Sequence, residues 1–307
     1  EMQRSLVGSE MCIRDSSKNY GQTRILTMIR QKSFVSQRPI VYLVPTPIGN
    51  LTELTPRALD ILNQVDLVAA EDTRNTRKLL THYGIHKSLL ACHEHNQKVA
   101  IPQVLEAIES GKSIAVVSDA GYPLVSDPGQ HLVETLIQKE IPVVSISGPN
   151  AALDALVASG LPCYHYMFYG FLDNKHNKRV QELETLKAFP YTILFYEAPH
   201  RIQTTLTDML TVLGDRKMVL ARELTKVHEE YLRGTISEIL DVCEELKGEM
   251  VIVMDGYQEE DSFDLDKAVD RVIDLSQTMK LKEACKQVAK ETGASKNVLY
   301  QEALKRK

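Results

Sequence analysis

The stretch IVYLVPTPIGNLTELTPRALDIL, residues 40–62, decides the fold. It begins with a short run of β-branched and apolar residues, 40–44, which predicts a buried strand. A stiff proline loop with one glycine follows, and Thr55-Pro56 is typical of a helix start, because proline is favoured in the first turn. A strand, a loop and a helix in this order predict parallel α/β architecture, in which ligands bind at the carboxyl ends of strands.

The same alternation continues outward from this stretch. Further strands are predicted at residues 67–70, 114–118 and 143–147, and helices at 56–64, 73–83, 97–110 and 128–139. A second series follows, with strands at 164–170, 192–196, 217–222, 230–234 and 250–255, and helices at 151–159, 175–189, 200–213 and 236–246. Because some strands of the second series are nearly adjacent, we expect a mixed sheet there.

The two ends of the chain differ from this pattern. Residues 1–39 show no periodicity, and we interpret them as a non-native or disordered leader, with the native start at Met28. An acidic linker at residues 259–264 leads into helices predicted at 268–278, 282–290 and 296–303, the last two with helix-turn-helix spacing. This tail is either a small bundle packed on the body or a nucleic-acid contact. The predicted domains are therefore 40–149, 150–256 and 257–307.

Composition limits the class of protein. A net charge of −5, with 43% hydrophobic and 25% charged residues, is typical of a globular protein. It argues weakly against a long track for naked nucleic acid, but allows local basic patches. The five cysteines form no metal or disulfide pattern. No run reaches the about 18 apolar residues of a membrane span, and no signal peptide is evident, so we expect a cytoplasmic protein without a membrane partner.

Two more glycine-containing loops follow predicted strands. They are SDAGYPLVSDPG, residues 118–129, and SGPNAA, residues 147–152. With the proline loop they would line a pocket with backbone amides and carbonyls, which suits a neutral, amphiphilic cofactor better than a polyphosphate. Asp127, directly before Pro128, is predicted to be a helix N-cap.

Charged residues also gather where predicted strands end. The sequence EDTR, residues 71–74, is followed by Arg77 and Lys78, which predicts either a solvated helix start or a phosphate contact. FYEAPHR, residues 195–201, and RELTKVHE, residues 222–229, carry charge that a buried sheet would not tolerate, so we expect ion pairing and substrate handling there. The histidines at 93 and 95 lack the spacing of metal ligands, and no metal site is predicted.

The motifs PTPIGNL, EDTR, SDAGYPLVSDPG, SGPNA, FYEAPHR and RELTKVHEE, in this order and spacing, resemble the ribosomal RNA small subunit methyltransferase I family of the tetrapyrrole methylases. The resemblance covers residues 40–255, and the tail is similar to that family's helical carboxy-terminal domain. It implies a two-domain α/β tetrapyrrole-methylase fold with a small helical tail, and a homodimer with S-adenosylmethionine in the cleft between domains. It also implies methylation of the 2'-hydroxyl of a cytidine in the decoding region of 16S ribosomal RNA, with the assembled 30S subunit as partner.

By motif position, the resemblance also implies residue roles. The cofactor would contact Gly49, Gly121, Tyr122, Val125, Gly148, Ala151, Ala198 and Leu224, where Tyr122 replaces the threonine of many relatives. The RNA would contact Arg74, Arg77 and Lys78. Because a ribose hydroxyl is a weak acid, its attack needs a base or an oxyanion stabiliser. We expect Lys226 or Arg201 as stabiliser, and Glu197, Glu223 or His228 as base, without ranking the three.

Two other functions fit parts of this pattern. A tetrapyrrole methylase acting on a corrin or porphyrin precursor would share the cofactor loops, but the tail and RELTKVHEE favour RNA. A non-catalytic RNA-binding or ribosome-binding protein that keeps the fold would not bind S-adenosylmethionine, which calorimetry can test.

Overall fold

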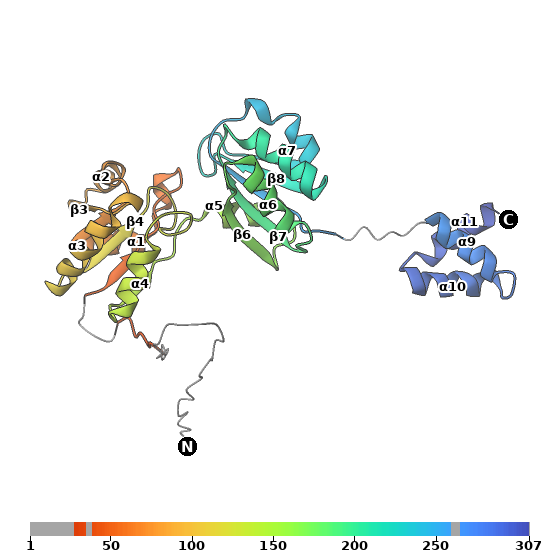
Figure 1. Cartoon of the computed structure of the whole chain (residues 1–307), viewed down its shortest axis with the longest axis horizontal. Helices are drawn as coiled ribbons and strands as arrows, with labels where there is room; N and C mark the ends of the chain where they lie inside the picture. The colour runs from red at the N-terminus through yellow and green to blue at the C-terminus, as the bar shows by residue number, and fades with distance from the viewer. Residues whose placement is uncertain (1–27, 35–38, 259–264, 307) are drawn as a thin grey trace, which may run out of the picture. The chain divides into compact units, whose positions relative to one another are not determined.

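The structure is a computed structural model that describes residues 28–34, 39–258 and 265–306 (Figure 1). Most of the predicted leader and the whole predicted acidic linker, residues 259–264, lie outside the described residues. The chain forms two compact units, one up to Ala151 and one from Ala152 onward. Within the described part, none of the helices is long and apolar enough to cross a membrane.

The first unit contains a five-stranded parallel sheet of order β3-β2-β4-β1-β5. Its strands are β1 (Val41–Leu43), β2 (Leu67–Ala70), β3 (Ser88–Ala91), β4 (Ile114–Val117) and β5 (Val143–Ser145). Four of the five were predicted and are confirmed. The strand β3 was not predicted, because its residues Ser-Leu-Leu-Ala lack the β-branched side chains that mark the other strands.

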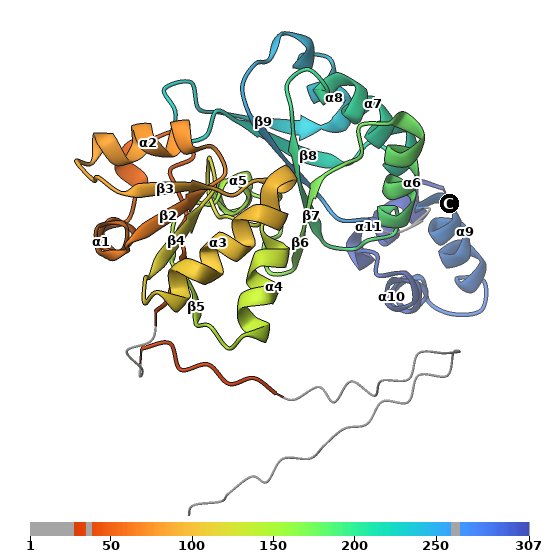
Figure 2. The same cartoon turned by 60° about the vertical axis from the view of Figure 1, so that its left-hand side comes forward.

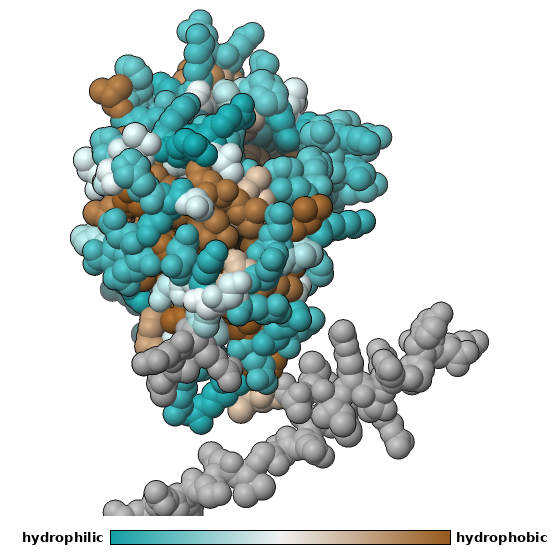
Figure 3. Space-filling view, turned by 90° about the vertical axis from the view of Figure 1, so that its left-hand side faces the viewer, coloured by the Kyte–Doolittle hydropathy of each residue, from teal (hydrophilic) through white to brown (hydrophobic). Residues whose placement is uncertain are grey.

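Helices cover both faces of this sheet (Figure 2). They are α1 (Pro56–Gln64), α2 (Thr73–His82), α3 (Gln97–Glu109) and α4 (Gln130–Gln138), with short 3-10 turns at Leu51–Glu53 and Glu94–Asn96. Leu62 of α1 and Leu80 of α2 share one apolar cluster with Val44, whereas Val104 of α3 and Leu132 of α4 belong to the cluster on the other face. On the face that Figure 3 shows, hydrophilic side chains surround a smaller group of exposed apolar ones.

The predicted N-cap at Asp127 was wrong. Helix α4 begins at Gln130, and its N-cap is Gly129, which has a φ of 132°. Leu124 and Ser126 both have positive φ, so the loop turns tightly and continues two residues further than the sequence suggested. Helix α1 follows the predicted start, because the Thr55 side chain accepts a hydrogen bond from the Ala58 amide.

The second unit contains a mixed sheet of order β6-β7-β10-β8-β9, as predicted. Its strands are β6 (Tyr166–Phe171), β7 (Thr192–Glu197), β8 (Lys217–Arg222), β9 (Glu230–Thr235) and β10 (Met250–Met254). Only β6 and β7 pair in parallel among these described strands. The helices of this part are α5 (Ala151–Ser159), α6 (His176–Leu186), α7 (Ile202–Leu213) and α8 (Ile236–Leu240), followed by a 3-10 turn at Cys243–Glu245. Phe195, Leu206 and Ile252 lie in one apolar cluster between sheet and helices.

The last described residues form a bundle of three helices with its own core. The helices are α9 (Leu265–Leu275), α10 (Leu281–Thr292) and α11 (Lys296–Lys305), close to the predicted ranges. Val272, Val288 and Leu299 are fully buried and bring one side chain from each helix into that core. Gly293 ends α10 with a φ of 75°, a left-handed conformation that glycine adopts without strain.

Candidate active site

At the carboxyl edge of the first sheet, the loops that follow β1 and β4 run to opposite faces of the sheet. These two strands are neighbours, yet the loop after β1 leads to α1 on one face and the loop after β4 leads to α4 on the other. Such a switch point leaves a crevice between diverging loops, where open α/β sheets bind their ligands. This edge of the sheet is therefore the candidate ligand-binding site.

Backbone hydrogen bonds tie these two loops together. The Thr46 amide donates to the Gly121 carbonyl and the Gly121 amide donates to the Thr46 carbonyl, both at 3.0 Å. The Thr46 hydroxyl also donates to the Ser118 carbonyl at 3.1 Å. Thr46 and Ser118 are buried, so the pairing has little competition from water. The loops after β1 and β4 consequently behave as one rigid piece.

The loop after β5 joins this piece through Tyr122. The Gly148 amide donates to the Tyr122 hydroxyl at 3.0 Å, which gives that side chain a structural contact. A Cβ at Gly148 would lie 2.8 Å from the Pro45 Cβ, so only glycine fits. Gly121 has a φ of 71°, and a Cβ there would lie 3.4 Å from the Ile48 side chain. The loops after β1 and β5 thus approach one another too closely for a side chain at Gly148, and the left-handed backbone of Gly121 favours glycine in the loop after β4.

The structure places most of the predicted cofactor residues at this edge. Gly49, Gly121, Tyr122, Val125, Gly148 and Ala151 all belong to the loops after β1, β4 and β5 or to the residue that begins α5. Val125 is exposed, between the positive-φ residues Leu124 and Ser126. Ala198 follows β7, and the buried Leu224 follows β8, in the second unit.

Carboxylates gather beside these loops. Burial raises the pKa of Glu71, and the charges of Asp127 and Asp119 raise it further. Burial also raises the pKa of Asp127, against a hydrogen bond from Ser118 that lowers it. Concentrated negative charge of this kind favours a cationic ligand and disfavours a polyphosphate. In the described ranges, no group of three or more histidine, cysteine or acidic side chains is arranged to hold a metal ion.

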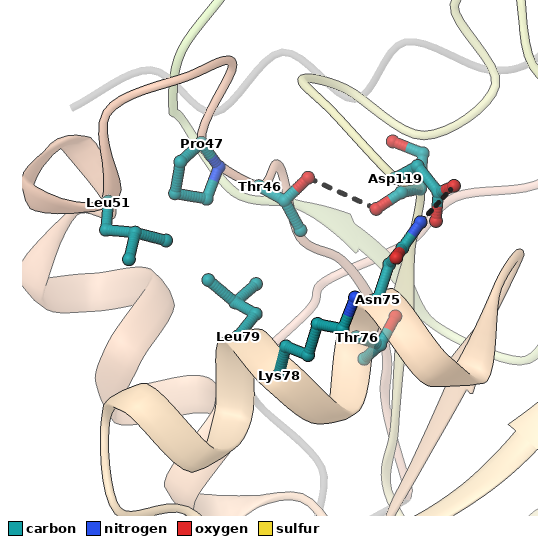
Figure 4. A pocket seen from close by; sticks show the side chains of 9 residues that line it. Thr46, Pro47, Leu51, Asn75, Thr76, Lys78, Leu79 and Asp119 are labelled. Carbon is teal, nitrogen blue, oxygen red and sulfur yellow. Dashed lines mark hydrogen bonds between the residues drawn. The ribbon is translucent and has the colours of Figure 1, made fainter.

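A pocket of about 220 Å³ lies between the loop after β1, helix α2 and the end of β4 (Figure 4). Its lining residues are Thr46, Pro47, Leu51, Asn75, Thr76, Lys78, Leu79, Ser118 and Asp119. Figure 4 shows Pro47, Leu51 and Leu79 on one side, with Asn75 and Asp119 on the other. The Asn75 side-chain amide donates to the Asp119 carboxylate at 3.0 Å. The pocket thus combines an apolar wall with a polar one.

The three residues predicted to contact RNA all lie on α2. Arg74 is 86% exposed at its side chain and forms an ion pair with Asp72 at 2.7 Å. Asp72 is the N-cap of α2, and its hydrogen bonds with Arg74 lower its pKa to about 2. Arg74 therefore has a local role at the helix start, whereas the exposed Arg77 and Lys78 form no ion pair with any described residue.

In the second unit, Glu197 and Arg201 are engaged with each other. The buried Glu197 carboxylate accepts hydrogen bonds from the Thr205 hydroxyl at 2.6 Å and the Ala198 amide at 2.8 Å. Arg201 lies 3.2 Å from the same carboxylate and donates to the Leu172 carbonyl at 2.8 Å. These contacts fix the turn between β7 and α7 and pair the two charges, although the buried Nε of Arg201 has no hydrogen-bond partner among the described residues.

Lys226 lies between two carboxylates. Its ammonium is 2.9 Å from Glu223 and 3.0 Å from Glu249. Partial burial works against the charged form, but these hydrogen bonds outweigh it and raise the pKa of Lys226. The same hydrogen bond lowers the pKa of Glu223, whose carboxylate also covers Gly248. His228, two residues beyond Lys226, is exposed.

Two residues of these sites, Asn75 and Glu249, were not predicted from the sequence. Asn75 could have been found, because it shares one face of α2 with Lys78, three positions along the helix. Glu249 precedes Met250, which pairs with Arg222 across the sheet, so its approach to Lys226 depends on the β8–β10 register. That register connects residues far apart in the chain and gives no local signal.

Solved structures share this fold. The uroporphyrin-III-C-methyltransferase from Thermus thermophilus matches 71% of this chain and 94% of its own, with a TM-score of 0.52 and 20% identity. The methyltransferase CobJ matches 71% and 94%, with a TM-score of 0.56 and 17% identity. A family model described as Tetrapyrrole (Corrin/Porphyrin) Methylases matches residues 40–240. This model covers more than half of the chain, so the chain belongs to the tetrapyrrole methylase family.

More similar relatives are named Ribosomal RNA small subunit methyltransferase I. The protein of Streptococcus pyogenes is 45% identical over 280 residues, 89% of this chain and 98% of its own. That of Bacillus subtilis is 48% identical over 236 residues, 76% and 81% of the two chains. The model of the RsmI C-terminal HTH domain matches residues 264–307. The chain belongs to the ribosomal RNA small subunit methyltransferase I family, and the predicted family and fold are confirmed.

Proposed function

We propose that this chain methylates small-subunit 16S ribosomal RNA, at the 2'-hydroxyl of a cytidine in the decoding region. The observation that carries this proposal is similarity over 98% of a relative's length, including the helical tail, at 45% identity. A corrin or porphyrin methylase is less favoured, because the two solved methyltransferases described above are only 20% and 17% identical to this chain. A non-catalytic protein is less favoured, because the relatives are named as methyltransferases.

S-adenosylmethionine is the proposed methyl donor, and the sheet edge fits it. Close approach of Gly148 to Pro45 leaves backbone amides and carbonyls, rather than side chains, to line the crevice. The nearby Glu71, Asp119 and Asp127 favour a positively charged sulfonium. Gly49, Gly121, Tyr122, Val125, Gly148 and Ala151 of the first unit and Ala198 and Leu224 of the second are the residues proposed to hold it. The donor supplies a methyl carbon that is open to nucleophilic attack.

Residues of the second unit are proposed to deprotonate the acceptor hydroxyl and to stabilise the alkoxide that forms. Lys226 keeps its charge, because its pKa is raised, and this suits it to stabilise a developing alkoxide rather than to accept a proton. Glu223 and Glu249 hold the ammonium in place. Among the candidate bases, Glu197 is engaged with Arg201 and Glu223 with Lys226, which leaves the exposed His228 as the proposed proton acceptor.

The proposed partner is the assembled 30S subunit, and the proposed location is therefore the cytoplasm. In the predicted domain 257–307, exposed Lys282, Lys286 and Lys290 follow one another at intervals of four along α10, on one side of the helix. Such a stripe suits contact with RNA phosphates. We also propose a homodimer, for which the exposed Tyr166 and Phe171 of edge strand β6 offer apolar surface.

Methyl transfer to purified ribosomal particles tests this function. Labelled S-adenosylmethionine, the protein and 30S subunits from cells lacking its gene should give one ribose-methylated cytidine, located by mass mapping. Free 16S RNA and a porphyrin precursor serve as comparisons and should accept less. Methylation of the precursor alone would favour the tetrapyrrole alternative. Failure to bind the donor in calorimetry would favour a non-catalytic protein.

A further inference from the structure

We propose that the pocket between the loop after β1 and helix α2 binds the base of the methylated nucleotide and selects cytosine over uracil. This inference rests on the proposed function and adds the residues that read the target. The sequence analysis assigned the Lys78 side chain to the RNA in general, without a pocket. Asn75 has no role in the proposed function, and Asp119 has only that of favouring a cationic donor.

The size and shape of the pocket fit one pyrimidine ring. Its volume is about 220 Å³, and a cavity of about 150 Å³ in a protein core is known to hold one benzene. A single six-membered ring with its substituents therefore fits. Pro47, Leu51 and Leu79 form an apolar wall against which a flat ring can lie (Figure 4). Proteins usually cover the face of a base splayed out of RNA with an aromatic ring or a guanidinium plane, and here the aliphatic side chains would cover it through apolar contact.

The polar wall matches the hydrogen-bonding edge of cytosine. One oxygen of Asp119 is held by the Asn75 amide at 3.0 Å, and no described residue donates to the other oxygen. Figure 4 shows the Lys78 ammonium on this side of the pocket. Cytosine carries an amino donor at N4 beside acceptors at N3 and O2, which a carboxylate and an ammonium complement in turn. Uracil presents a carbonyl where cytosine has its amino group, and this would face the carboxylate.

The surrounding charge argues against a phosphate in this pocket. Glu71 and Asp127 lie close enough to Asp119 to influence one another electrostatically. A phosphate would be repelled by these carboxylates, whereas a neutral base with an amino group would not. Position supports the same ligand, because Thr46 lines the pocket and is hydrogen-bonded to Gly121 of the proposed donor site. A base bound here would carry its own ribose to that edge.

The test compares 30S subunits with cytidine or uridine at the methylated position. The wild-type protein should prefer cytidine in kcat/KM by about ten- to a hundredfold. Asp119→Asn, whose amide can donate to the uracil carbonyl, should reduce that preference at least about tenfold. Asp60→Asn removes the same charge from the exposed surface of α1 and should leave the preference unchanged. Donor affinity, measured by calorimetry, should be unchanged in Asp60→Asn. Any weaker donor binding in Asp119→Asn lowers kcat/KM for both subunits alike, so it does not alter the preference for one of them.

A second variant keeps the test decisive. Leu79→Trp fills the pocket from its apolar side and should abolish transfer to the cytidine subunits while donor binding persists. An unchanged preference in Asp119→Asn, or full turnover in Leu79→Trp, overturns the proposal. Loss of turnover on both subunits in Asp119→Asn at a saturating donor concentration also overturns it, because a residue that only reads the base would not be required for both. If the wild-type protein methylates neither subunit, the proposed function fails instead.

Discussion

Gly148→Ala should damage the three-loop edge of the first sheet. The new Cβ would lie 2.8 Å from the Pro45 Cβ and 3.1 Å from its Cγ. Carbon atoms pack at about 3.5 Å or more, so the two loops must separate by roughly 0.7 Å. The Pro45 ring cannot turn away, because Pro45 directly follows Val44, which is fully buried just after strand β1. Crowding of this kind costs about 1–3 kcal/mol of unfolding free energy.

The same movement should weaken donor binding. It stretches the 3.0 Å hydrogen bond between the Gly148 amide and the Tyr122 hydroxyl towards its limit. It also displaces backbone groups that the proposed donor site uses. We therefore expect S-adenosylmethionine to bind at least about tenfold more weakly, which corresponds to about 1.4 kcal/mol. Urea denaturation measures the stability of the variant, and titration calorimetry measures the affinity.

Gly111→Ala is the matched control for this change. Gly111 belongs to the same unit, has a φ of 83° and leaves nothing within 4 Å of an added Cβ. Alanine there should lower stability by about 1 kcal/mol through backbone strain alone, with unchanged donor affinity. If Gly148→Ala lowers stability but binds the donor within about twofold of the wild type, the three loops do not form the donor site.

Three further perturbations test separate parts of the molecule. Lys226→Met should lower kcat by about a hundred- to a thousandfold while donor affinity persists, if the ammonium stabilises the alkoxide; steady-state kinetics on 30S subunits measures this. Burial, then the charges of Asp127 and Asp119, raise the pKa of Glu71 in the folded chain above its unfolded value, so its ionised form disfavours folding at neutral pH. Glu71→Gln should therefore stabilise the protein at pH 7, and denaturation at a series of pH values should show this gain fading as the pH falls to about 4. Lys286→Gln should weaken RNA binding and reduce the slope of log K against log salt by about 0.7–0.9, without changing donor affinity.

The fold could be predicted wherever the residue pattern is local. β-Branched runs marked four strands of the first sheet, and Thr55-Pro56 marked the start of α1. Prediction failed where tertiary packing decides the conformation. The strand β3 (Ser88–Ala91) has no β-branched residue and is specified by pairing with β2. Helix α4 starts late because positive φ at Leu124 and Ser126 extends the preceding loop.

The candidate site was predictable to a similar degree. Loops at strand ends identified the sheet edge, because parallel strands bring their carboxyl ends together. The pocket beside it depends on a hydrogen bond between Asn75 and Asp119, which are 44 positions apart. The two carboxylates around Lys226 depend on strand register. Neither arrangement can be predicted from a local sequence pattern, because each brings together residues that are far apart in the chain.

The distribution of charge reconciles an RNA substrate with a net charge of −5. Carboxylates gather at the sheet edge, where Glu71, Asp119 and Asp127 favour a cationic donor and repel phosphates. Exposed lysines follow one side of α10, in a bundle with its own core. Charges in solution are screened beyond about 10 Å, so each group acts mainly on the part of a large substrate that it contacts. A protein can therefore hold an RNA backbone with one segment and keep phosphate out of its reaction site with another, whatever its total charge.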